Sequence, residues 1–296
     1  PVTDNMVLQL ISTPTAYAGI DAIICQGGSY AVSDAAVTKY SSFIWTKSGT
    51  GSLTGDNTLT PTYTPSAADF VTGAVTLTLT VQPNSPCAAA AVDQMIISIQ
   101  SPPTANAGVD ATTCEGNTFT LSGAVTNSAS FAWTTTGSGS FTGISTNSPR
   151  YIPSAADAIA GSVTFTLTAV ANSPCVTNVS DDMTLTVVPR PVVNAGNDAV
   201  ICATNIYDLS LATTLATASN TASTLWSTSG DGIFSNMGLL HPTYTPGSGD
   251  ISSGQVRLTL TGQPNSSCSS PASDYMVLTI NNLPTANAGP PTVSIC

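Results

Sequence analysis

The sequence is poor in charged side chains, which make up 7% of its 296 residues. It holds five Lys plus Arg, one histidine (His241) and one glutamate (Glu115), so the net charge of −11 rests almost wholly on aspartate. Because no Lys/Arg cluster exists, the chain has no electrostatic attraction for nucleic acid or for an anionic membrane surface. Divalent cations are the only charged partners that this balance favours.

Long apolar runs and catalytic signatures are missing as well. No apolar stretch approaches the roughly 18 residues of a membrane-spanning helix, and no basic leader followed by an apolar segment stands at Pro1. The single histidine serves at most one catalytic triad, and no nucleophile–base pair recurs, so we do not expect an enzyme. What is abundant is Thr, Ser, Asn, Gly and Pro, which suit exposed strand faces and turns and indicate an all-β protein.

An internal repeat organises the chain. The motif Pro-x-x-Asn/Tyr-Ala-Gly begins at Pro14, Pro103, Pro191 and Pro284. The first three copies are followed by the same later elements, among them a tryptophan, "YTPSAAD" or a variant of it, and "NSPC" or "NSSC". The first residues, "PVTDNMVLQLIS", match the end of a repeat. We therefore expect an array of similar units: the last strand of a preceding repeat at 1–13, whole repeats at 14–102, 103–190 and 191–283, and the first strand of a following repeat at 284–296.

Each whole repeat shows strand patterns and little helix. In "VTLTLTV", residues 75–81, apolar residues alternate with threonine, which predicts a strand with one buried face. Some seven such strands in about 90 residues, with a tryptophan on the third, predict an immunoglobulin-like sandwich. "PSAAD" is expected to form at most one helical turn, begun by its proline. Short, proline-containing links favour a stiff rod of sandwiches.

The combination of motifs resembles a known repeat type. Asn-Ala-Gly-x-Asp…Cys, the tryptophan strand, "YTPSAAD", "LTLT" and the "NSPC…SDxM" close are similar to the PKD-like/Ig-like repeats of giant surface proteins from gliding and other bacteria of the Bacteroidetes group. That resemblance implies export by type IX secretion, a cell-surface location, and a role as adhesin, stalk or filament, including gliding-motility adhesins. It carries no catalytic residues.

The cysteines recur in step with the repeat, which favours disulfides in an oxidising compartment. No Cys-x-x-Cys is present and the histidine is not repeated, so a metal site fits poorly. Two pairings stay open. The one we favour joins cysteines within a repeat (Cys25–Cys87, Cys114–Cys175, Cys202–Cys268). The other joins neighbouring repeats (Cys25–Cys175, Cys114–Cys268), and it answers the objection that the two cysteines of one Ig sandwich lie at opposite ends. Cys296 lacks its partner in both schemes.

Two recurring sets of aspartates are candidates for calcium, because hard cations bind several oxygen ligands. These are Asp21, Asp110 and Asp198 after the glycine motif, and Asp69, Asp157 and Asp250 in "YTPSAAD" and its variants. The alternative is that each caps a turn by accepting backbone N–H groups. No Asp-x-Asp-x-Asp cluster is present, which favours the capping role, and calcium is the one cofactor left open.

The remaining recurrent residues are expected to build the core or turns. Core packing is the expected role of Trp45, Trp133, Trp226, Met95, Met183 and Met276. An exposed tryptophan platform for carbohydrate is the alternative. The Gly-x-Gly after each tryptophan is expected to be a strand-end turn and no phosphate loop.

Three functions follow in order of preference. The first is a disulfide-stabilised extracellular stalk or filament segment whose partners are neighbouring repeats, with lateral self-association permitted by threonine-rich faces and exposed edge strands. The second is an adhesion module whose repeats bind a glycan or a surface themselves. The segment before Trp226, "NIYDLSLATTLATASNTAST", is the most divergent and is the candidate binding loop. An enzyme comes last.

Overall fold

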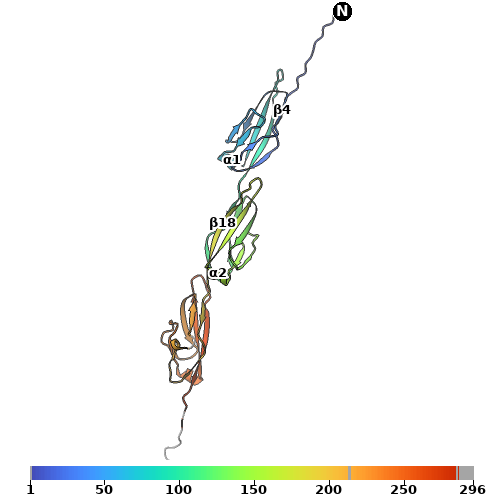
Figure 1. The fold of residues 1–296 in the computed structure, drawn as a ribbon. Helices are drawn as coiled ribbons and strands as arrows, with labels where there is room; N and C mark the ends of the chain where they lie inside the picture. The colour runs from blue at the N-terminus through green and yellow to red at the C-terminus, as the bar shows by residue number, and fades with distance from the viewer. Residues whose placement is uncertain (1, 213–214, 285, 287–296) are drawn as a thin grey trace, which may run out of the picture.

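Three β-sandwiches follow one another end to end in the computed structural model, which describes residues 2–212, 215–284 and 286 (Figure 1). Each sandwich is formed by one continuous stretch of the chain, and the three lie in a row and form a rod. Sequence similarity between the repeats is matched by the structure, because each sandwich is built from the same elements in the same order.

The elements of each repeat are nine strands and one short helix. In the first sandwich they are β1 (Thr15–Tyr17), β2 (Ala22–Cys25), β3 (Tyr30–Ala31), β4 (Ala36–Thr38), β5 (Tyr40–Lys47), β6 (Ser52–Thr54), β7 (Thr62–Thr64), α1 (Ala67–Thr72), β8 (Ala74–Pro83) and β9 (Ala91–Gln100). In the second they are β10 (Thr104–Asn106), β11 (Ala111–Cys114), β12 (Phe119–Thr120), β13 (Ala124–Thr126), β14 (Ser128–Thr135), β15 (Ser140–Thr142), β16 (Arg150–Ile152), α2 (Ala155–Ala160), β17 (Ser162–Ala171) and β18 (Val179–Val188).

The third sandwich differs by one added 3-10 turn. Its elements are β19 (Val192–Asn194), β20 (Ala199–Cys202), β21 (Tyr207–Asp208), η1 (Leu209–Leu211), β22 (Thr217–Ser219), β23 (Thr221–Thr228), β24 (Ile233–Phe234), β25 (Thr243–Thr245), α3 (Ser248–Ser253), β26 (Gln255–Pro264) and β27 (Ala272–Asn281). The turn η1 lies in the divergent segment noted in the sequence.

Two layers of strands form each sandwich. In the first repeat one layer is the four-stranded sheet β2-β9-β8-β5, and the other combines the pair β1-β4 with the sheet β3-β7-β6. The second and third repeats have the same topology. The prediction of an all-β, immunoglobulin-like fold is confirmed. Nine strands stand where about seven are predicted, because the first and second strands of the Ig pattern are each interrupted, as β1/β2 and β3/β4.

The interruption of the first strand matters for the ends of the rod. β1 pairs with β4 in one layer, whereas β2 crosses to the other layer and pairs in parallel with the last strand, β9. This register places Cys25 opposite Gln100, at the end of the sandwich where the chain leaves for the next repeat. The equivalent residues are Cys114 opposite Val188 and Cys202 opposite Asn281.

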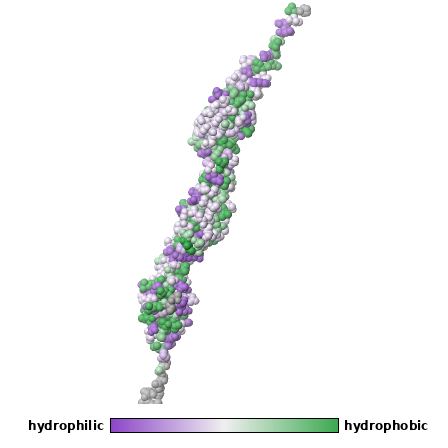
Figure 2. Space-filling model, viewed as in Figure 1, coloured by the Kyte–Doolittle hydropathy of each residue, from purple (hydrophilic) through white to green (hydrophobic). Residues whose placement is uncertain are grey.

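The core lies between the two layers. On β8, Val75, Leu77, Leu79 and Val81 are at most 1% exposed, while the threonines between them are half-buried on the outer side. Such alternation is what a sheet with one buried face requires. Figure 2 shows the visible face of the rod largely in near-neutral colours, in keeping with threonine and serine on outward strand positions.

The segment after the seventh strand forms a slightly longer helix than predicted. Helix α1 covers six residues, and its N-cap is Ser66, so Pro65 precedes the cap and does not begin the helix. Ser66 and Asp69 form a reciprocal capping box, and Gly73 ends the helix with φ of 76°. A left-handed residue at this position favours glycine because glycine lacks the Cβ that would clash.

The links between sandwiches are short. Ser101–Pro103 separates β9 from β10, and residues 189–191 separate β18 from β19. Residues 2–14 form no strand, so their assignment to a preceding repeat stays a prediction. The predicted first strand at 284–296, with Cys296, lies almost entirely outside the described residues.

Candidate functional site at the bridged junctions

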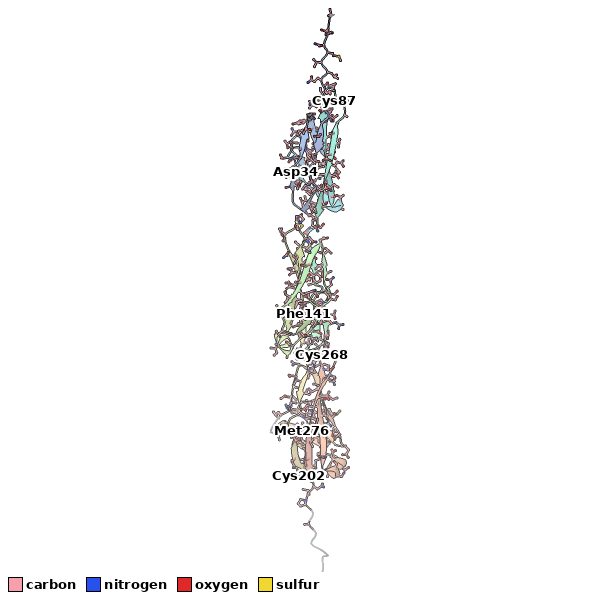
Figure 3. The ribbon with its side chains drawn as sticks, turned by 90° about the vertical axis from the view of Figure 1, so that its right-hand side faces the viewer. Asp34, Cys87, Phe141, Cys202, Cys268 and Met276 are labelled. Atoms are coloured by element: carbon pink, nitrogen blue, oxygen red, sulfur yellow. A yellow bond between two sulfur atoms is a disulfide. The ribbon has the colours of Figure 1, made fainter. Side chains whose placement is uncertain are left out.

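Each junction between sandwiches is crossed by a disulfide. Cys25 of the first repeat is bonded to Cys175 of the second, and Cys114 of the second is bonded to Cys268 of the third. The Cα atoms are 4.9 and 5.0 Å apart, within the usual range for a disulfide. Figure 3 shows Cys268 at the boundary between the second and third sandwiches.

The favoured pairing within a repeat is wrong, and strand length explains why. In the second repeat Cys114 ends β11 beside the end of β18, while Cys175 lies in the turn that begins β18. Ten residues of β18 separate these two positions along the sandwich, which is about 33 Å at 3.3 Å per residue. A disulfide needs Cα atoms within about 7 Å, so the two cysteines of one repeat cannot reach each other.

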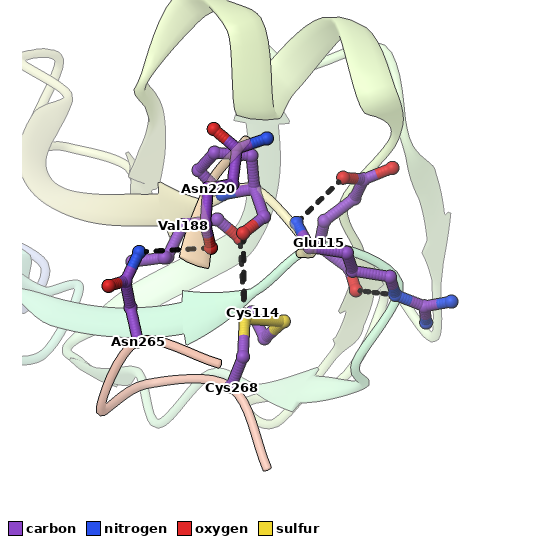
Figure 4. Close-up of a disulfide and its surroundings, with 8 residues drawn as sticks. Cys114, Glu115, Val188, Asn220, Asn265 and Cys268 are labelled. Carbon is purple, nitrogen blue, oxygen red and sulfur yellow. Dashed lines mark hydrogen bonds between the residues drawn. A yellow bond between two sulfur atoms is a disulfide. The ribbon is translucent and has the colours of Figure 1, made fainter. Parts of the chain in front are cut away.

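Backbone and side-chain contacts surround the second bridge (Figure 4). The Sγ atom of Cys268 lies 3.8 Å from the carbonyl oxygen of Val188, which is the last residue of β18. Glu115 donates its N–H to the same carbonyl at 2.9 Å. The Arg190 Nε group donates to the Glu115 carbonyl at 2.8 Å, and the Arg190 N–H donates to the Glu115 carboxylate at 3.2 Å. The linker is therefore held against the exit end of the second sandwich, beside the bridge.

Cys87 and Cys202 have no disulfide partner among the described residues. They mark opposite ends of the array in Figure 3. The Sγ atom of Cys87 lies 3.6 Å from the carbonyl of Ile11, just as Cys175 Sγ lies 3.6 Å from the carbonyl of Gln100. Cys87 thus occupies the same position relative to the preceding segment as a cysteine that is bridged.

The aspartates of "YTPSAAD" lie in a buried hydrogen-bond cluster. In the second repeat the Asp157 carboxylate, 4% exposed, accepts the Tyr151 hydroxyl at 2.6 Å and the backbone N–H groups of Ser138 and Ser154 at 2.8 and 2.9 Å. The Ser138 hydroxyl donates to the same carboxylate at 3.1 Å. Asp69 and Asp250 make equivalent bonds with Tyr63 and Tyr244.

These bonds set the charge of the cluster. Burial by itself would raise the pKa of Asp157, but the hydrogen bonds from Tyr151, Ser138 and Ser154 outweigh burial and lower the pKa to about 2. The same balance lowers the pKa of Asp69. Burial, followed by the bond to Asp157, raises the pKa of Tyr151 to about 12. The carboxylate therefore stays charged and the phenol neutral over the ordinary pH range.

Sequence reasoning missed the tyrosine of this cluster, although the signal was present. Each tyrosine precedes its aspartate by six residues, and Gly-x-Gly recurs ahead of both. A Cβ at Gly137 would lie within 3 Å of Tyr151 and Val163 side-chain atoms. The glycines are thus required because the tyrosine and the aspartate approach the backbone closely, and they do more than end a strand.

The third repeat replaces part of the cluster. Gly247 stands where the other repeats have a capping serine and provides no side-chain cap. Asp231 compensates, because its carboxylate accepts the N–H groups of Gly249 and Asp250 at 2.9 and 3.1 Å. These two bonds lower the pKa of Asp231, and the bond from Gly249 has the larger effect.

The other candidate calcium residues also accept backbone N–H groups. Asp21, Asp110 and Asp198 are exposed, and each accepts one N–H from the last strand of its repeat at 2.8 Å, from Ile96, Thr184 and Val277 in turn. Within residues 2–212, 215–284 and 286, no group of three or more His, Cys, Asp or Glu side chains is placed to hold a metal ion. The arrangement matches the capping role.

The tryptophans and methionines lie in the three cores. Trp45, Trp133 and Trp226 are 2, 5 and 0% exposed, and Met95, Met183 and Met276 are at most 2% exposed. Buried side chains cannot present a platform to a carbohydrate. The indole Nε1 groups of Trp45 and Trp226 donate to the carbonyls of Thr58 and Leu240, whereas that of Trp133 has no partner among the residues that the structure describes.

Comparison with known proteins supports the fold. No protein-family model matches the chain, and no curated protein matches it. A solved structure of three tandem titin Ig domains, an E-to-A mutated variant, is 15% identical; the match covers 92% of this chain and 100% of that one, with a TM-score of 0.54. Three tandem cadherin domains of human CDH23 are 13% identical over 90% of this chain and 100% of theirs, with a TM-score of 0.52.

At such identities the likeness shows the fold alone: tandem Ig-like and cadherin-like β-sandwich domains. Two disulfides fit an extracellular location, because such bonds persist in oxidising surroundings. In the part of the chain that the structure describes, no helix is long and apolar enough to span a membrane.

Proposed function

We propose that this chain is a stiff spacer segment of a large bacterial surface protein, in which tandem sandwiches hold a functional part away from the cell. The observation that carries the proposal is the double covalent connection at each junction, where a short linker and a disulfide join the same two sandwiches. Two connections restrict bending and twisting more than a single linker does. A spacer needs this rigidity, whereas an independent binding domain does not.

The composition supports the same role. A threonine-rich and serine-rich surface with few charges offers little for specific recognition, and the recurrent aspartates are occupied by backbone N–H groups. The resemblance of the repeat motifs extends the proposal to an adhesin stalk of the Bacteroidetes type, exported by type IX secretion and serving attachment or gliding.

Surface labelling tests this proposal. An antibody against the 296-residue chain is applied to intact cells of the source organism and, as a control, to cells treated with an external protease. We expect label on intact cells and its loss after protease treatment. Label that appears only after permeabilisation would refute a surface role.

A second candidate function is binding by the third repeat. Its added turn η1 leaves Leu211 79% exposed, and a hollow beside it is lined by Tyr207, Asp198 and Leu211. The other two repeats have no such turn. A glycan array probed with the whole chain and with a Leu211→Ser variant tests this function. Binding that the variant loses would favour an adhesion module over a plain spacer.

A further inference from the structure

The bridges connect the sandwiches in a particular order. Each joins the exit end of one repeat to the entry end of the next, because Cys25 lies opposite Gln100 while Cys175 lies in the turn before β18. The Sγ atom of Cys175 is 3.6 Å from the carbonyl of Gln100. A disulfide therefore stands beside the peptide linker at the same junction, in parallel with it.

We propose that these disulfides bear load, and that the protein is a tether in which the bridges limit the lengthening that domain unfolding can cause. The proposal rests on the extracellular spacer role and adds a mechanical function to it. An ordinary tandem Ig array lengthens when a domain unfolds, because each unfolded domain releases its whole chain. Here the bridges exclude most of the first and third repeats from the path that carries the force.

The load path can be followed from residue to residue. Tension that enters near Pro14 runs through β1 and β2 to Cys25 and crosses the first bridge to Cys175. The shortest covalent connection from there leads back through the second repeat to Cys114 and across the second bridge to Cys268. Residues 26–113 and 176–267 are longer connections between the same two bridges and lie in parallel with this path. Unfolding within these two segments cannot add to the end-to-end length while both bridges are intact.

The first load-bearing segment is already nearly straight. Cys25 follows Pro14 by 11 residues, and this stretch contains β1 and β2. Fully extended, 11 residues reach about 38 Å. The same stretch runs the length of one sandwich, which is roughly 35–45 Å long as judged from its ten-residue strands and turns. The folded rod therefore leaves little slack in this segment.

The chain itself gives a measurable limit. With both bridges intact, the shortest covalent path from Pro14 to Leu283 runs to Cys25, from Cys175 back to Cys114, and from Cys268 onward, which is about 90 residues. With both reduced, the path is the full chain of about 270 residues between the same points. The difference is about 180 residues, or roughly 600 Å of contour length.

Single-molecule stretching of the 296-residue chain, held by handles at its two ends, tests the proposal. A background with Cys87, Cys202 and Cys296 changed to serine removes competing thiols. We expect complete unfolding of the oxidised chain to reach a contour about 600 Å shorter than that of the reduced chain. Equal contours in the two states would overturn the proposal.

Removal of one bridge provides the matched control. In the variant Cys25→Ser/Cys175→Ser the remaining bridge leaves a path of about 115 residues, and in Cys114→Ser/Cys268→Ser the path is about 120 residues. If the cysteines paired within repeats, this background would permit only Cys114–Cys175, and the first variant would open to the full path of about 270 residues, which would refute the load path. Circular dichroism of each variant verifies that the sandwiches are folded before stretching. A chain that is found inside the cell could still reach the shorter contour when it is oxidised. Failure of the load-bearing proposal is therefore distinguishable from failure of the spacer role.

Discussion

The buried carboxylate of the second repeat offers the sharpest test of how each sandwich is held together. Each carboxylate oxygen of Asp157 accepts one backbone N–H: Oδ1 accepts that of Ser138, and Oδ2 accepts that of Ser154. Asparagine has nearly the same shape but only one acceptor oxygen. In Asp157→Asn, one of these N–H groups must therefore face the amide nitrogen, whichever way the side chain is turned.

The expected cost can be worked from these contacts. A buried donor that loses its acceptor costs about 1–3 kcal/mol, and bonds to a charged acceptor are stronger than neutral ones. The Tyr151 hydroxyl also loses its charged partner. We expect Asp157→Asn to destabilise the second sandwich by about 3 kcal/mol, which is about a hundredfold in the population of its open state.

Hydrogen–deuterium exchange of the oxidised chain measures this effect in place. Backbone amides at the centre of β17, between Val163 and Ala169, should exchange about a hundredfold faster where exchange requires unfolding of the sandwich. The first and third repeats of the same molecule are internal references and should exchange as in the unchanged chain.

A matched variant distinguishes the cluster from a general effect of removing charge. Asp110 is exposed and accepts a single N–H, from Thr184 at 2.8 Å, which an asparagine oxygen can also accept. Asp110→Asn should therefore change stability by less than about 0.5 kcal/mol. If β17 amides exchange at the same rate in Asp157→Asn and Asp110→Asn, the hydrogen-bond cluster does not stabilise the sandwich as argued.

Three further predictions follow from the same contacts. Because the folded pKa of Asp157 is about 2 against an ordinary 3.8, its contribution is present above about pH 4 and is lost as pH falls toward 2; acid titration followed by circular dichroism should show this loss, and Asp157→Asn should lack it. Chelation by EDTA should leave the melting temperature unchanged, since the recurrent aspartates accept backbone N–H groups, and a lower melting temperature would indicate calcium. Trp133→Phe should cost about 1 kcal/mol less than Trp45→Phe in urea unfolding, because only the Trp45 indole gives up a hydrogen bond, to the Thr58 carbonyl; equal costs would count against this account.

Local sequence patterns were sufficient to predict the fold. The alternation of residues 75–81 predicts a strand, and β8 (Ala74–Pro83) buries the apolar set and turns the threonines outward. Such patterns are informative because a strand displays its side chains with a period of two. They were less informative about where a strand is interrupted. The sequence pattern predicts β1 and β2 as one strand, because the crossing between layers depends on which strand each half pairs with.

The site was harder to predict, because it depends on distances between residues far apart in sequence. The recurrence of "NSPC" and of a cysteine after Asn-Ala-Gly indicates disulfides, but it does not distinguish pairing within a repeat from pairing between repeats. Likewise the tyrosine of "YTPSAAD" looks like an ordinary core residue in the sequence. Only the packed structure brings its hydroxyl to the aspartate and both to the Gly-x-Gly backbone.

The sequence by itself determined the repeat, the β-sandwich class and the positions of the cysteines, because each of these follows from local periodicity and spacing. The tertiary structure decided which cysteine meets which. Parallel pairing of β11 with β18 places Cys114 at the exit end of its sandwich, ten strand residues from the turn that holds Cys175. Each of the four bridged cysteines therefore meets one in the neighbouring repeat, and the bonds that form join the sandwiches to each other.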